Sequence, residues 1–373
     1  MRISIDFTAA IGDRTGIGTY ALELVRALLP LVGPDELRLD VHAYRHPGWH
    51  AKIRRLLSTV PEVRANRFLP HGLLLRAERA LGWPRHETVF GAADVHHGTN
   101  YLAPPSRRAR IVITVHDLAF VRFAKEIPVP HQYARYIRTS VERAHRIIAV
   151  SKATRRDLVE LFAVEPARIA VIPEGAPASL PAVPPEEFAA LRERWGLPER
   201  YFLFVGTLEP RKNLPRLVRA FDAAARRIVG RKGLLLLGRP GWAMEDLRSE
   251  IRRCPFPIAT PGFVPTEVRN AALANAVALV LPSLWEGFGL PVLEAFRAGT
   301  PVVASAAGAL PEVAGDAALL ADPTDTEGLA AALIRMAADP DLRADLTRRG
   351  TQRVRRFTWE RTARETLEVY RNA

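Results

Sequence analysis

Short apolar runs alternate with amphipathic stretches along most of the chain. The runs end at turn-forming residues, which predicts buried strands. In the first half they occupy residues 3–7, 39–44, 111–115, 147–150 and 169–172. The stretch 17–29 instead repeats its apolar residues at helical spacing, and 131–143 and 151–161 are further helix candidates, the last capped by Ser151.

The second half repeats this alternation. Apolar runs at 201–205, 234–237, 277–281, 301–304 and 317–320 predict strands. The stretches between and after them predict helices at about 186–195, 214–228, 266–274, 291–298, 325–338, 339–349 and 358–371. Five prolines within 173–185 mark a linker between the two series. Residues 47–85 show no clear period, so we interpret them as a mobile or surface insertion.

Alternating strands and helices favour parallel sheets covered by helices. We therefore expect an α/β protein with two doubly wound, Rossmann-like domains facing a central cleft. Residues 1–180 form the first domain and 181–373 the second. The last helix, about 358–371, is a candidate for packing back on the N-terminal domain.

Composition narrows the class of protein. The 373 residues suit two domains, and a hydrophobic fraction of 48% is ordinary for a packed core. The single cysteine excludes an intrachain disulfide and a cysteine zinc site. The first residues read as a strand, and the longest apolar stretch is far shorter than the ~18–20 residues of a membrane-spanning helix. We expect a cytoplasmic protein.

The segment 282–301 carries the clearest candidate chemistry. Glu286 and Glu294 lie eight positions apart, and the pattern predicts strand, loop, helix and strand in that order. Pro291 suits the first residue of the helix and Gly299 the position just past its end. A loop and a helix N-terminus at the carboxyl edge of a parallel sheet suit a phosphate, and a carboxylate one turn into the helix can accept hydrogen bonds from hydroxyls. The segment predicts a site for a sugar attached to a phosphate.

A second loop in this half places Arg211 and Lys212 after the strand 201–205, with Gly206 between. Arg binds phosphate oxygens bidentately and Lys acts as a point charge, so the pair suits a diphosphate. A solvated charge pair is the alternative. Phe263 and Val264, in the loop before 266–274, are candidates for reading a base edge through backbone groups.

The first half carries a glycine pair and a histidine. Gly16 and Gly18 fit the pattern G-x-G-x-x-A, but the preceding strand ends eight residues earlier, which argues against a dinucleotide fold. We interpret them as a flexible loop that closes on a phosphate or sugar; an ordinary helix start is the alternative. His116 and Asp117 directly follow the strand 111–115 and could bind sugar hydroxyls, or else form a capping pair.

The sequence lacks the motifs of metal sites and of several other classes of enzyme. His96 and His97 are adjacent in an extended segment and point to opposite sides, and no His/Asp/Glu cluster appears at ligand spacing. We therefore expect no metal and no other cofactor. A Walker loop, the kinase motifs and the G-x-S-x-G serine motif are missing from the sequence. Lys and Arg are spread among acids along the chain, so we expect no nucleic-acid partner.

The segment from Glu286 to Glu294 resembles the E-x7-E signature of the retaining nucleotide-sugar glycosyltransferases of family 4, which have the GT-B fold. The resemblance covers nearly the whole chain, with weaker matches at 16–18, 171–175, 206–213 and 310–313. Two departures stand out. Thr207 follows Gly206 where many members have Arg, and Glu174 lies where many have Asn.

The resemblance implies a metal-independent transfer of a hexose from a nucleotide diphosphate sugar to a hydroxyl of a glycan or lipid-linked acceptor, as in polysaccharide biosynthesis. Residues 207–213 resemble members that use GDP-mannose, while UDP- and ADP-sugars stay open. By position, the resemblance assigns Glu294 to the donor ribose and Glu286 to the donor sugar. It assigns Arg211 and Lys212 to the diphosphate, and the backbone of Phe288, Gly289 and Leu290 to sugar or phosphate. In the first half, it assigns His116 to the transferred sugar and Gly16 to the donor phosphate.

Two other activities fit the same fold. One is a sugar-nucleotide epimerase or phosphorylase, and the other is a catalytically silent sugar-binding subunit. The net charge of +13, from 53 basic and 40 acidic residues, also suits peripheral contact with the inner face of an anionic membrane. The candidate contact residues are Arg54, Arg55, Arg64, Arg67, Arg76 and Arg79.

Overall fold

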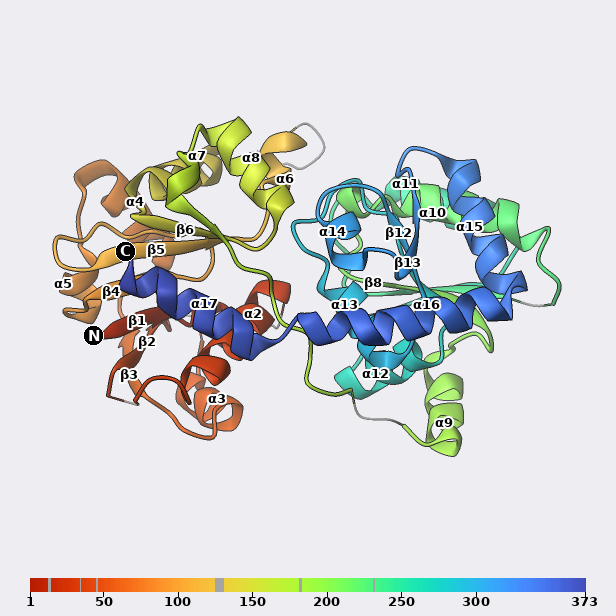
Figure 1. Ribbon diagram of the computed structural model, residues 1–373, viewed down its shortest axis with the longest axis horizontal. Helices are drawn as coiled ribbons and strands as arrows, with labels where there is room; N and C mark the ends of the chain where they lie inside the picture. The colour runs from red at the N-terminus through yellow and green to blue at the C-terminus, as the bar shows by residue number, and fades with distance from the viewer. Residues whose placement is uncertain (13–14, 34, 45, 125–130, 181–182, 231) are drawn as a thin grey trace. The chain divides into compact units, whose positions relative to one another are not determined.

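The computed structural model describes residues 1–373 except 13–14, 34, 45, 125–130, 181–182 and 231. The described chain divides into two compact units, unit 1 with residues 1–124, 131–175 and 358–373, and unit 2 with residues 176–357. Each unit is built on one parallel sheet with helices on both faces (Figure 1). The expected α/β class with two doubly wound, Rossmann-like units is confirmed.

Unit 1 contains a seven-stranded sheet in the order β3-β2-β1-β4-β5-β6-β7. Its central strands are buried on both faces, which explains their apolar runs. The strands are β1 (Ile3–Asp6), β2 (Leu37–His42), β3 (Glu62–Asn66), β4 (Val95–Gly98), β5 (Arg110–Val115), β6 (Arg146–Ala149) and β7 (Ile169–Val171).

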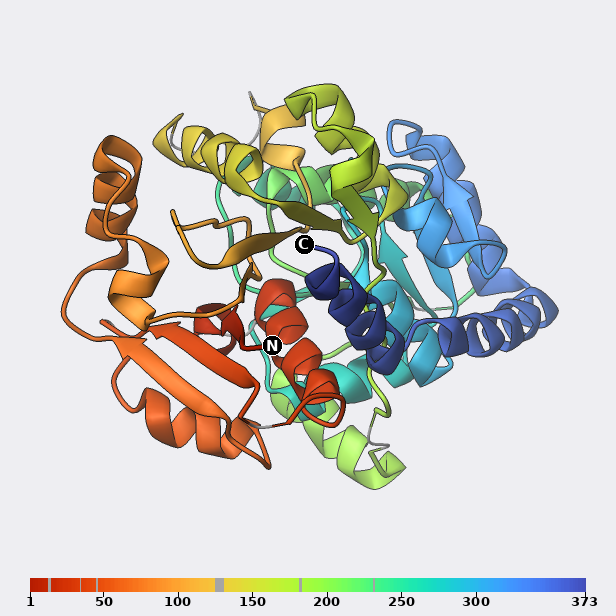
Figure 2. The ribbon, with the colours of Figure 1, turned by 60° about the vertical axis from the view of Figure 1, so that its left-hand side comes forward.

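The helices of unit 1 include the last helix of the chain. They are α1 (Thr8–Ile11), α2 (Gly16–Leu28), α3 (Trp49–Leu56), α4 (His71–Leu81), α5 (His86–Phe90), α6 (Ala119–Arg122), α7 (His131–Arg143), α8 (Lys152–Phe162) and α17 (Trp359–Arg371), with a 3₁₀ turn at Pro166–Arg168. Helix α17 packs beside α2 (Figure 2). The Tyr370 hydroxyl lies 2.6 Å from Nδ1 of buried His97, and the Thr362 hydroxyl donates to the carbonyl O of Pro173 at 2.7 Å.

Unit 2 contains a six-stranded sheet in the order β10-β9-β8-β11-β12-β13. The strands are β8 (Tyr201–Val205), β9 (Gly233–Leu237), β10 (Ile258–Gly262), β11 (Ala278–Leu281), β12 (Val302–Ser305) and β13 (Ala318–Ala321). The helices are α9 (Pro185–Trp195), α10 (Leu214–Ala225), α11 (Glu245–Arg253), α12 (Thr266–Ala274), α13 (Leu290–Ala298), α14 (Leu310–Ala314), α15 (Thr326–Ala338) and α16 (Pro340–Arg353), with 3₁₀ turns at Pro210–Lys212 and Val354–Arg356. In the described part of the chain, no helix combines the length and apolarity needed to cross a bilayer.

Strand order places a topological switch point in each sheet. In unit 2 the chain runs from β8 outward to β9 and β10, then returns to place β11 on the other side of β8. In unit 1 the same reversal lies between β1 and β4. The loops after the two flanking strands diverge at such a point and leave room for a ligand. The loops after β8 and β11 carry Arg211, Lys212 and Glu286.

The structure corrects the interpretation of residues 47–85 as an insertion. They contain α3, the edge strand β3 and α4, and β3 pairs in register with β2. Strand β3 alternates exposed and partly buried residues, so it lacks an apolar run. Strands β4 and β10 were not predicted, because the two central residues of β4 are buried histidines and β10 is a short edge strand that contains a proline. The highly charged helix α11 was not predicted either.

Candidate active site

The loop after β8 is held against the loop after β11 by backbone and side-chain hydrogen bonds. Asn213, at positive φ, donates from Nδ2 to the carbonyl O atoms of Pro282 and Pro323 at 3.0 and 2.7 Å. The N–H of Leu284 donates to the carbonyl O of Arg211 at 2.8 Å. These bonds fix the 3₁₀ turn at Pro210–Lys212, so both cations project from a rigid segment.

Glu286 is the centre of an ion cluster in unit 2. Nζ of Lys212 donates to its Oε1 at 2.7 Å, and Nη1 of Arg211 donates to its Oε2 at 2.9 Å. The Ser283 hydroxyl donates to Oε1 at 2.6 Å. Arg211 also pairs with Glu209 at 2.8 Å and donates to the carbonyl O of Trp285 at 2.8 Å. The predicted residues Arg211, Lys212 and Glu286 therefore lie together, and the two cations are not a solvated pair.

Electrostatics keep the buried carboxylate of Glu286 ionised. The residue is 7% exposed, and burial by itself would raise its pKa. The charges of Lys212 and Arg211, with the hydrogen bonds from Lys212 and Ser283, outweigh burial and lower the pKa to about 2. Glu286 is therefore an anion at neutral pH, which orients both cations.

The segment between Glu286 and α13 depends on two glycines. A Cβ on Gly308 would lie 2.4 Å from the carbonyl O of Glu286, so the two backbones touch. Gly289 precedes the first residue of α13 with φ of 107°, a conformation that favours glycine. Phe288 is buried against Phe357, with ring centroids 6.0 Å apart. Helix α13 begins at Leu290, one residue before the predicted start at Pro291, and ends at Ala298, so Gly299 lies just past its end as predicted.

Glu294 lies on α13 and forms an ion pair with Arg269 of α12 through Oε2. Arg269 was not predicted as a site residue, because nothing in its local sequence shows that α12 passes beside α13. Glu294 is partly buried, and Arg269 contacts one of its carboxylate oxygens. The other oxygen can accept hydrogen bonds from hydroxyls.

Phe263 and Val264 follow β10 and differ in exposure. Val264 is buried, whereas the Phe263 ring is largely exposed and lies 4.7 Å from the guanidinium carbon of Arg239. Arg239 belongs to the loop after β9. An exposed ring beside a guanidinium offers a flat surface on which a base could stack.

In unit 1, His116 directly follows β5 and is buried. Its Nδ1 lies 3.0 Å from Oε1 of Glu174, and its Nε2 lies 2.9 Å from the carbonyl O of Thr99. Tyr20 of α2 meets the imidazole edge-on, with centroids 4.8 Å apart. Glu174, a departure from the family pattern in the sequence, is the carboxylate partner of His116 in the structure.

The glycine pair differs from the expected flexible loop. Gly16 and Gly18 form the first turn of α2, and Thr15 caps that helix by accepting from the N–H of Gly18 at 3.4 Å. A Cβ on Gly18 would lie 2.6 Å from the carbonyl O of Ala9, so Gly18 lets α1 and α2 approach. The Asp117 carboxylate accepts from the N–H of Ala119 at 3.0 Å, as in a capping residue.

The structure also corrects the expectation that no histidine–carboxylate cluster exists. Asp40, His86 and His96 place one ligand atom each within 4.8 Å of one another in unit 1. The residues are far apart in sequence, so residue spacing could not reveal them. His97 points away from this cluster and bonds Thr114 and Tyr370, as expected for adjacent residues in a strand.

Comparison with known proteins supports the glycosyltransferase resemblance. Residues 14–180 match the family model described as Glycosyltransferase Family 4, and residues 187–353 match the model described as Glycosyl transferases group 1. The O-antigen chain mannosyltransferase B of Escherichia coli is 32% identical over 385 residues, which cover 96% of each protein. A D-inositol 3-phosphate glycosyltransferase of Acidothermus cellulolyticus is 34% identical over 393 residues, covering 97% of this chain and 86% of the relative.

Solved structures share the fold. HepE of Anabaena, solved in complex with UDP and glucose, superposes with a TM-score of 0.76 at 17% identity, and the match covers 100% of both chains. At this identity the likeness supports the architecture alone.

Replacing Glu286 by Gln removes the charge and keeps the shape of the side chain. The pKa of Glu286 is lowered from 4.5 to about 2 on folding, so its stabilisation is complete above pH 4.5 and is lost as the pH falls through about 2. We expect the wild type to lose roughly 3 kcal/mol more unfolding free energy than Glu286→Gln between about pH 5 and 2. Urea unfolding at stepped pH measures this difference.

The control is Glu267→Gln, which removes an exposed carboxylate from α12 of the same unit. This variant should keep the acid sensitivity of the wild type. If Glu286→Gln also keeps it, the carboxylate of Glu286 does not hold the two cations.

Proposed function

The chain belongs to the glycosyltransferases of family 4, and from that premise we propose that it transfers mannose from GDP-mannose to a hydroxyl of a glycan or lipid-linked acceptor, with retention of configuration. The observation that supports this most is the Arg211–Lys212–Glu286 cluster at the switch point of unit 2. The mannosyltransferase relative favours mannose as the sugar. Neither relative named above is an epimerase, a phosphorylase or a silent subunit.

The reaction leaves negative charge on the departing diphosphate. Preorganised cations stabilise such charge because they need not reorient during the reaction. An ammonium has three N–H donors, and Glu286 accepts one from Lys212. We assign the remaining Lys212 donors and the guanidinium of Arg211 to the diphosphate oxygens, together with Gly206 and the backbone N–H groups of 288–290 at the start of α13.

In this proposal the main role of Glu286 is to position Arg211 and Lys212. Both of its oxygens already have protein partners, so it positions Arg211 and Lys212 whether or not it also meets the donor sugar. Glu294 is assigned to the donor ribose, and Phe263 with the backbone of Val264 to the base. No metal takes part in this proposal, since the two cations supply the positive charge.

Unit 1 is assigned to the acceptor and to the remaining donor contacts. His116 is assigned to the transferred sugar, and Gly16 and Gly18 at the start of α2 to the donor phosphate. The contacts with Glu174 and Thr99 hold the His116 ring in one orientation. We draw the retention of configuration from the family resemblance, with attack and departure on the same face of the sugar.

The test of the proposed function compares donors. Among GDP-mannose, UDP-glucose and ADP-glucose, we expect GDP-mannose to raise the melting temperature most, because the proposed donor should bind most tightly. A ligand at 100 times its Kd adds about 2.7 kcal/mol to the free energy of unfolding. Nucleotide release from the best donor should then require an added glycan or lipid-linked acceptor, and NMR of the product should show the anomeric configuration of the donor. A larger shift with a UDP- or ADP-sugar contradicts the donor assignment, and an isomerised donor contradicts transfer.

Lys212→Ala tests the role of the cation pair. Loss of one preorganised donor should lower kcat/KM roughly 10²- to 10³-fold, whereas folding should change little because Arg211 still pairs with Glu286. Arg226→Ala is the matched control, since it removes an exposed cation of the same unit and should keep wild-type turnover. Wild-type turnover in Lys212→Ala would refute the phosphate assignment.

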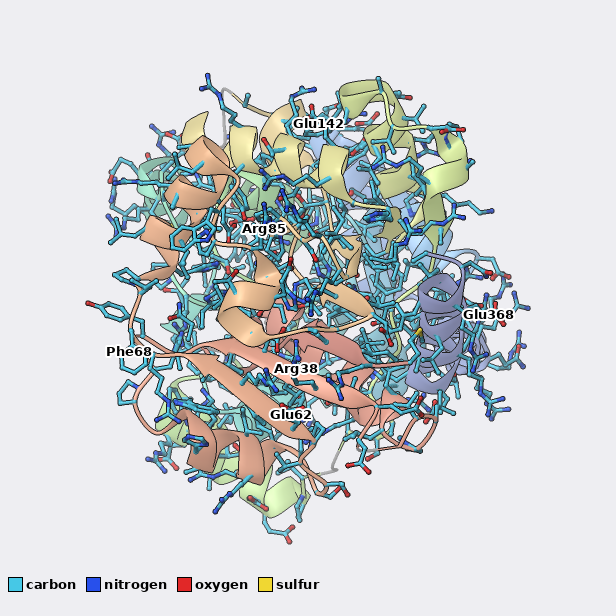
Figure 3. All side chains as sticks on the ribbon, turned by 90° about the vertical axis from the view of Figure 1, so that its left-hand side faces the viewer. Arg38, Glu62, Phe68, Arg85, Glu142 and Glu368 are labelled. Atoms are coloured by element: carbon cyan, nitrogen blue, oxygen red, sulfur yellow. The ribbon has the colours of Figure 1, made fainter. Side chains whose placement is uncertain are left out.

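We also propose peripheral contact between unit 1 and an anionic membrane. The segment around β3 exposes large apolar side chains, among them Phe68 at 86%, Leu81 and Trp83. Figure 3 shows Phe68 at the edge of unit 1. The same segment exposes Arg54, Arg55, Arg67 and Arg76. Apolar side chains flanked by cations suit a surface of anionic lipid, at up to ~1 kcal/mol per well-placed cation.

Co-sedimentation with vesicles checks this surface. At low salt the wild type should bind phosphatidylserine vesicles more strongly than phosphatidylcholine vesicles, and Phe68→Ser/Leu81→Ser should bind less. Val229→Ser is the control, because Val229 is 94% exposed but lies in unit 2. Equal binding of the double variant and the control would refute the assignment to this segment.

A further inference from the structure

One face of the unit 1 sheet is polar and buried. In the register of the strands, Ser4 lies beside His96 on β4, and Asp40 lies on β2 beside Asp6. His86, on α5, meets these side chains from above the sheet, and its ring lies 4.1 Å from that of His96 by centroids. Ser4, Asp40, His86 and His96 are each buried. Four polar side chains from three strands and a helix thus meet in the interior of unit 1.

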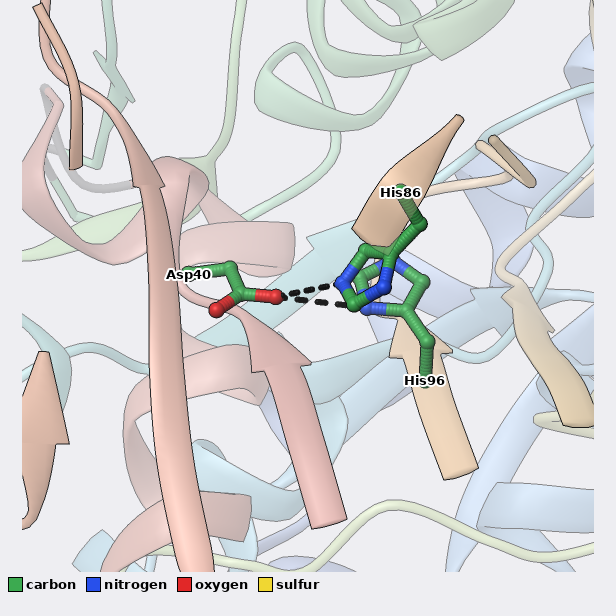
Figure 4. A group of neighbouring side chains, drawn as sticks. All are labelled: Asp40, His86 and His96. Atoms are coloured by element: carbon green, nitrogen blue, oxygen red, sulfur yellow. Dashed lines mark hydrogen bonds and ion pairs between the residues drawn. The ribbon is translucent and has the colours of Figure 1, made fainter. Parts of the chain in front are cut away.

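Figure 4 shows the carboxylate of Asp40 facing the rings of His86 and His96. Oδ2 of Asp40 lies 2.7 Å from Nε2 of His86 and 3.6 Å from Nδ1 of His96. The Ser4 hydroxyl oxygen lies 2.9 Å from Nδ1 of His96 and 3.2 Å from Nε2 of His86, and it also contacts Asp40. Ligands bound tetrahedrally at 2.0–2.2 Å from an ion lie about 3.4 Å apart. The separation between Asp40 and His96 is close to that spacing, and the other pairs are closer together, so the groups would move apart slightly around an ion.

We propose that Asp40, His86 and His96, with the Ser4 hydroxyl as the fourth donor, bind one divalent transition-metal ion in a structural site, and that Zn²⁺ fits it best. Two imidazole nitrogens and one carboxylate oxygen are a donor set that zinc accepts. Because all four residues are buried, the site has no position open to a substrate. The proposal concerns the stability of unit 1 and is independent of the transfer reaction.

Neighbouring residues orient the carboxylate. Nε of Arg38 donates to Oδ1 of Asp40 at 2.9 Å, which leaves Oδ2 facing the two histidines. Nη1 and Nη2 of Arg38 donate to the carbonyl O atoms of Ala92 and Gly91, so the guanidinium is itself fixed. Hydrogen bonds of this kind to a ligand carboxylate are typical of metal sites.

Carboxylates gather on one side of the cluster. A cavity of about 30 Å³ adjoins the cluster, and Asp6 and Glu78 line it with Asp40. A cation bound at the cluster would lie close to these carboxylates, which favours its binding. The cavity has room for a water or an ion and is too small for a sugar.

A hydrogen-bonded network without a metal is the competing account. Both accounts leave Nδ1 of His86 buried and without a hydrogen-bond partner among the described residues, because Nε2 is the atom that faces Asp40 and Ser4. Metal binding itself therefore distinguishes them. An ion would tie together β1, β2, β4 and α5, whose contributing residues are up to 92 positions apart in sequence. Metal binding would then add directly to the folding free energy of unit 1.

The test uses the full-length protein without a histidine tag, stripped with chelator and dialysed. Zn²⁺ alone should bind with one ion per chain by elemental analysis and raise the melting temperature. Co²⁺ should bind with the same stoichiometry and give the visible absorption of a tetrahedral site. X-ray absorption at the zinc edge should show two imidazoles. Substoichiometric binding, or an ion without imidazole ligands, would overturn the proposal.

Two adjacent histidines provide matched variants. His96→Gln removes a proposed ligand, and His97→Gln removes a buried imidazole that points to the other side of the sheet. Loss of a residue outside the ligand set already costs about 10- to 100-fold in metal affinity, so His96→Gln should weaken Zn²⁺ binding by at least about 100-fold. His97→Gln should keep one ion per chain. Equal affinity in the two variants would overturn the site, and the wild-type spectra decide the matter should His96→Gln fail to fold.

Discussion

The pairing of buried Glu286 with Arg211 and Lys212 is the interaction on which the candidate active site depends. A lone carboxylate at this depth would be protonated, and two adjacent cations without it would repel each other. Removing Glu286 would cost about 3–5 kcal/mol, because both cations would lose their shared carboxylate, whereas removing Lys212 leaves Glu286 paired with Arg211. The loops after β8 and β11 are therefore coupled: neither can hold its charged residues in place without the other.

Buried carboxylates in unit 1 likewise have basic partners, which here include histidines. His116 is buried between Glu174 and the carbonyl O of Thr99, and Asp40 is buried between Arg38 and two histidines. Each buried carboxylate has a basic partner from a different element of the chain. Polar groups buried in this way fix the relative positions of strands and helices, since each lost partner leaves an unsatisfied charge. The candidate active site of unit 2 and the interior of unit 1 thus both contain buried carboxylates paired with basic side chains.

Much of the fold could be predicted because a buried parallel strand must be apolar on both faces. This rule located β8, β9, β11 and β12 to within about a residue or two. It failed for β3, an edge strand with exposed side chains, and for β4, whose buried residues are histidines. Within 47–85, which we interpreted as an insertion, α4 packs beside the polar residues that line the cavity near Asp40, whereas α3 contributes Trp49 and Ile53 to the apolar core.

By itself the sequence determined the α/β class, the two series of strands and helices, and the E-x7-E segment with the cations of 211 and 212. These features depend on the order and spacing of residues along the chain, which local sequence records directly. Only the tertiary structure decided which groups meet: Glu174 with His116, Arg269 with Glu294, and Asp40 with His86 and His96. The physical reason is that such pairs are made by strand order and helix packing. Their partners lie 25 to 58 positions apart for the first two pairs, beyond the reach of any local pattern.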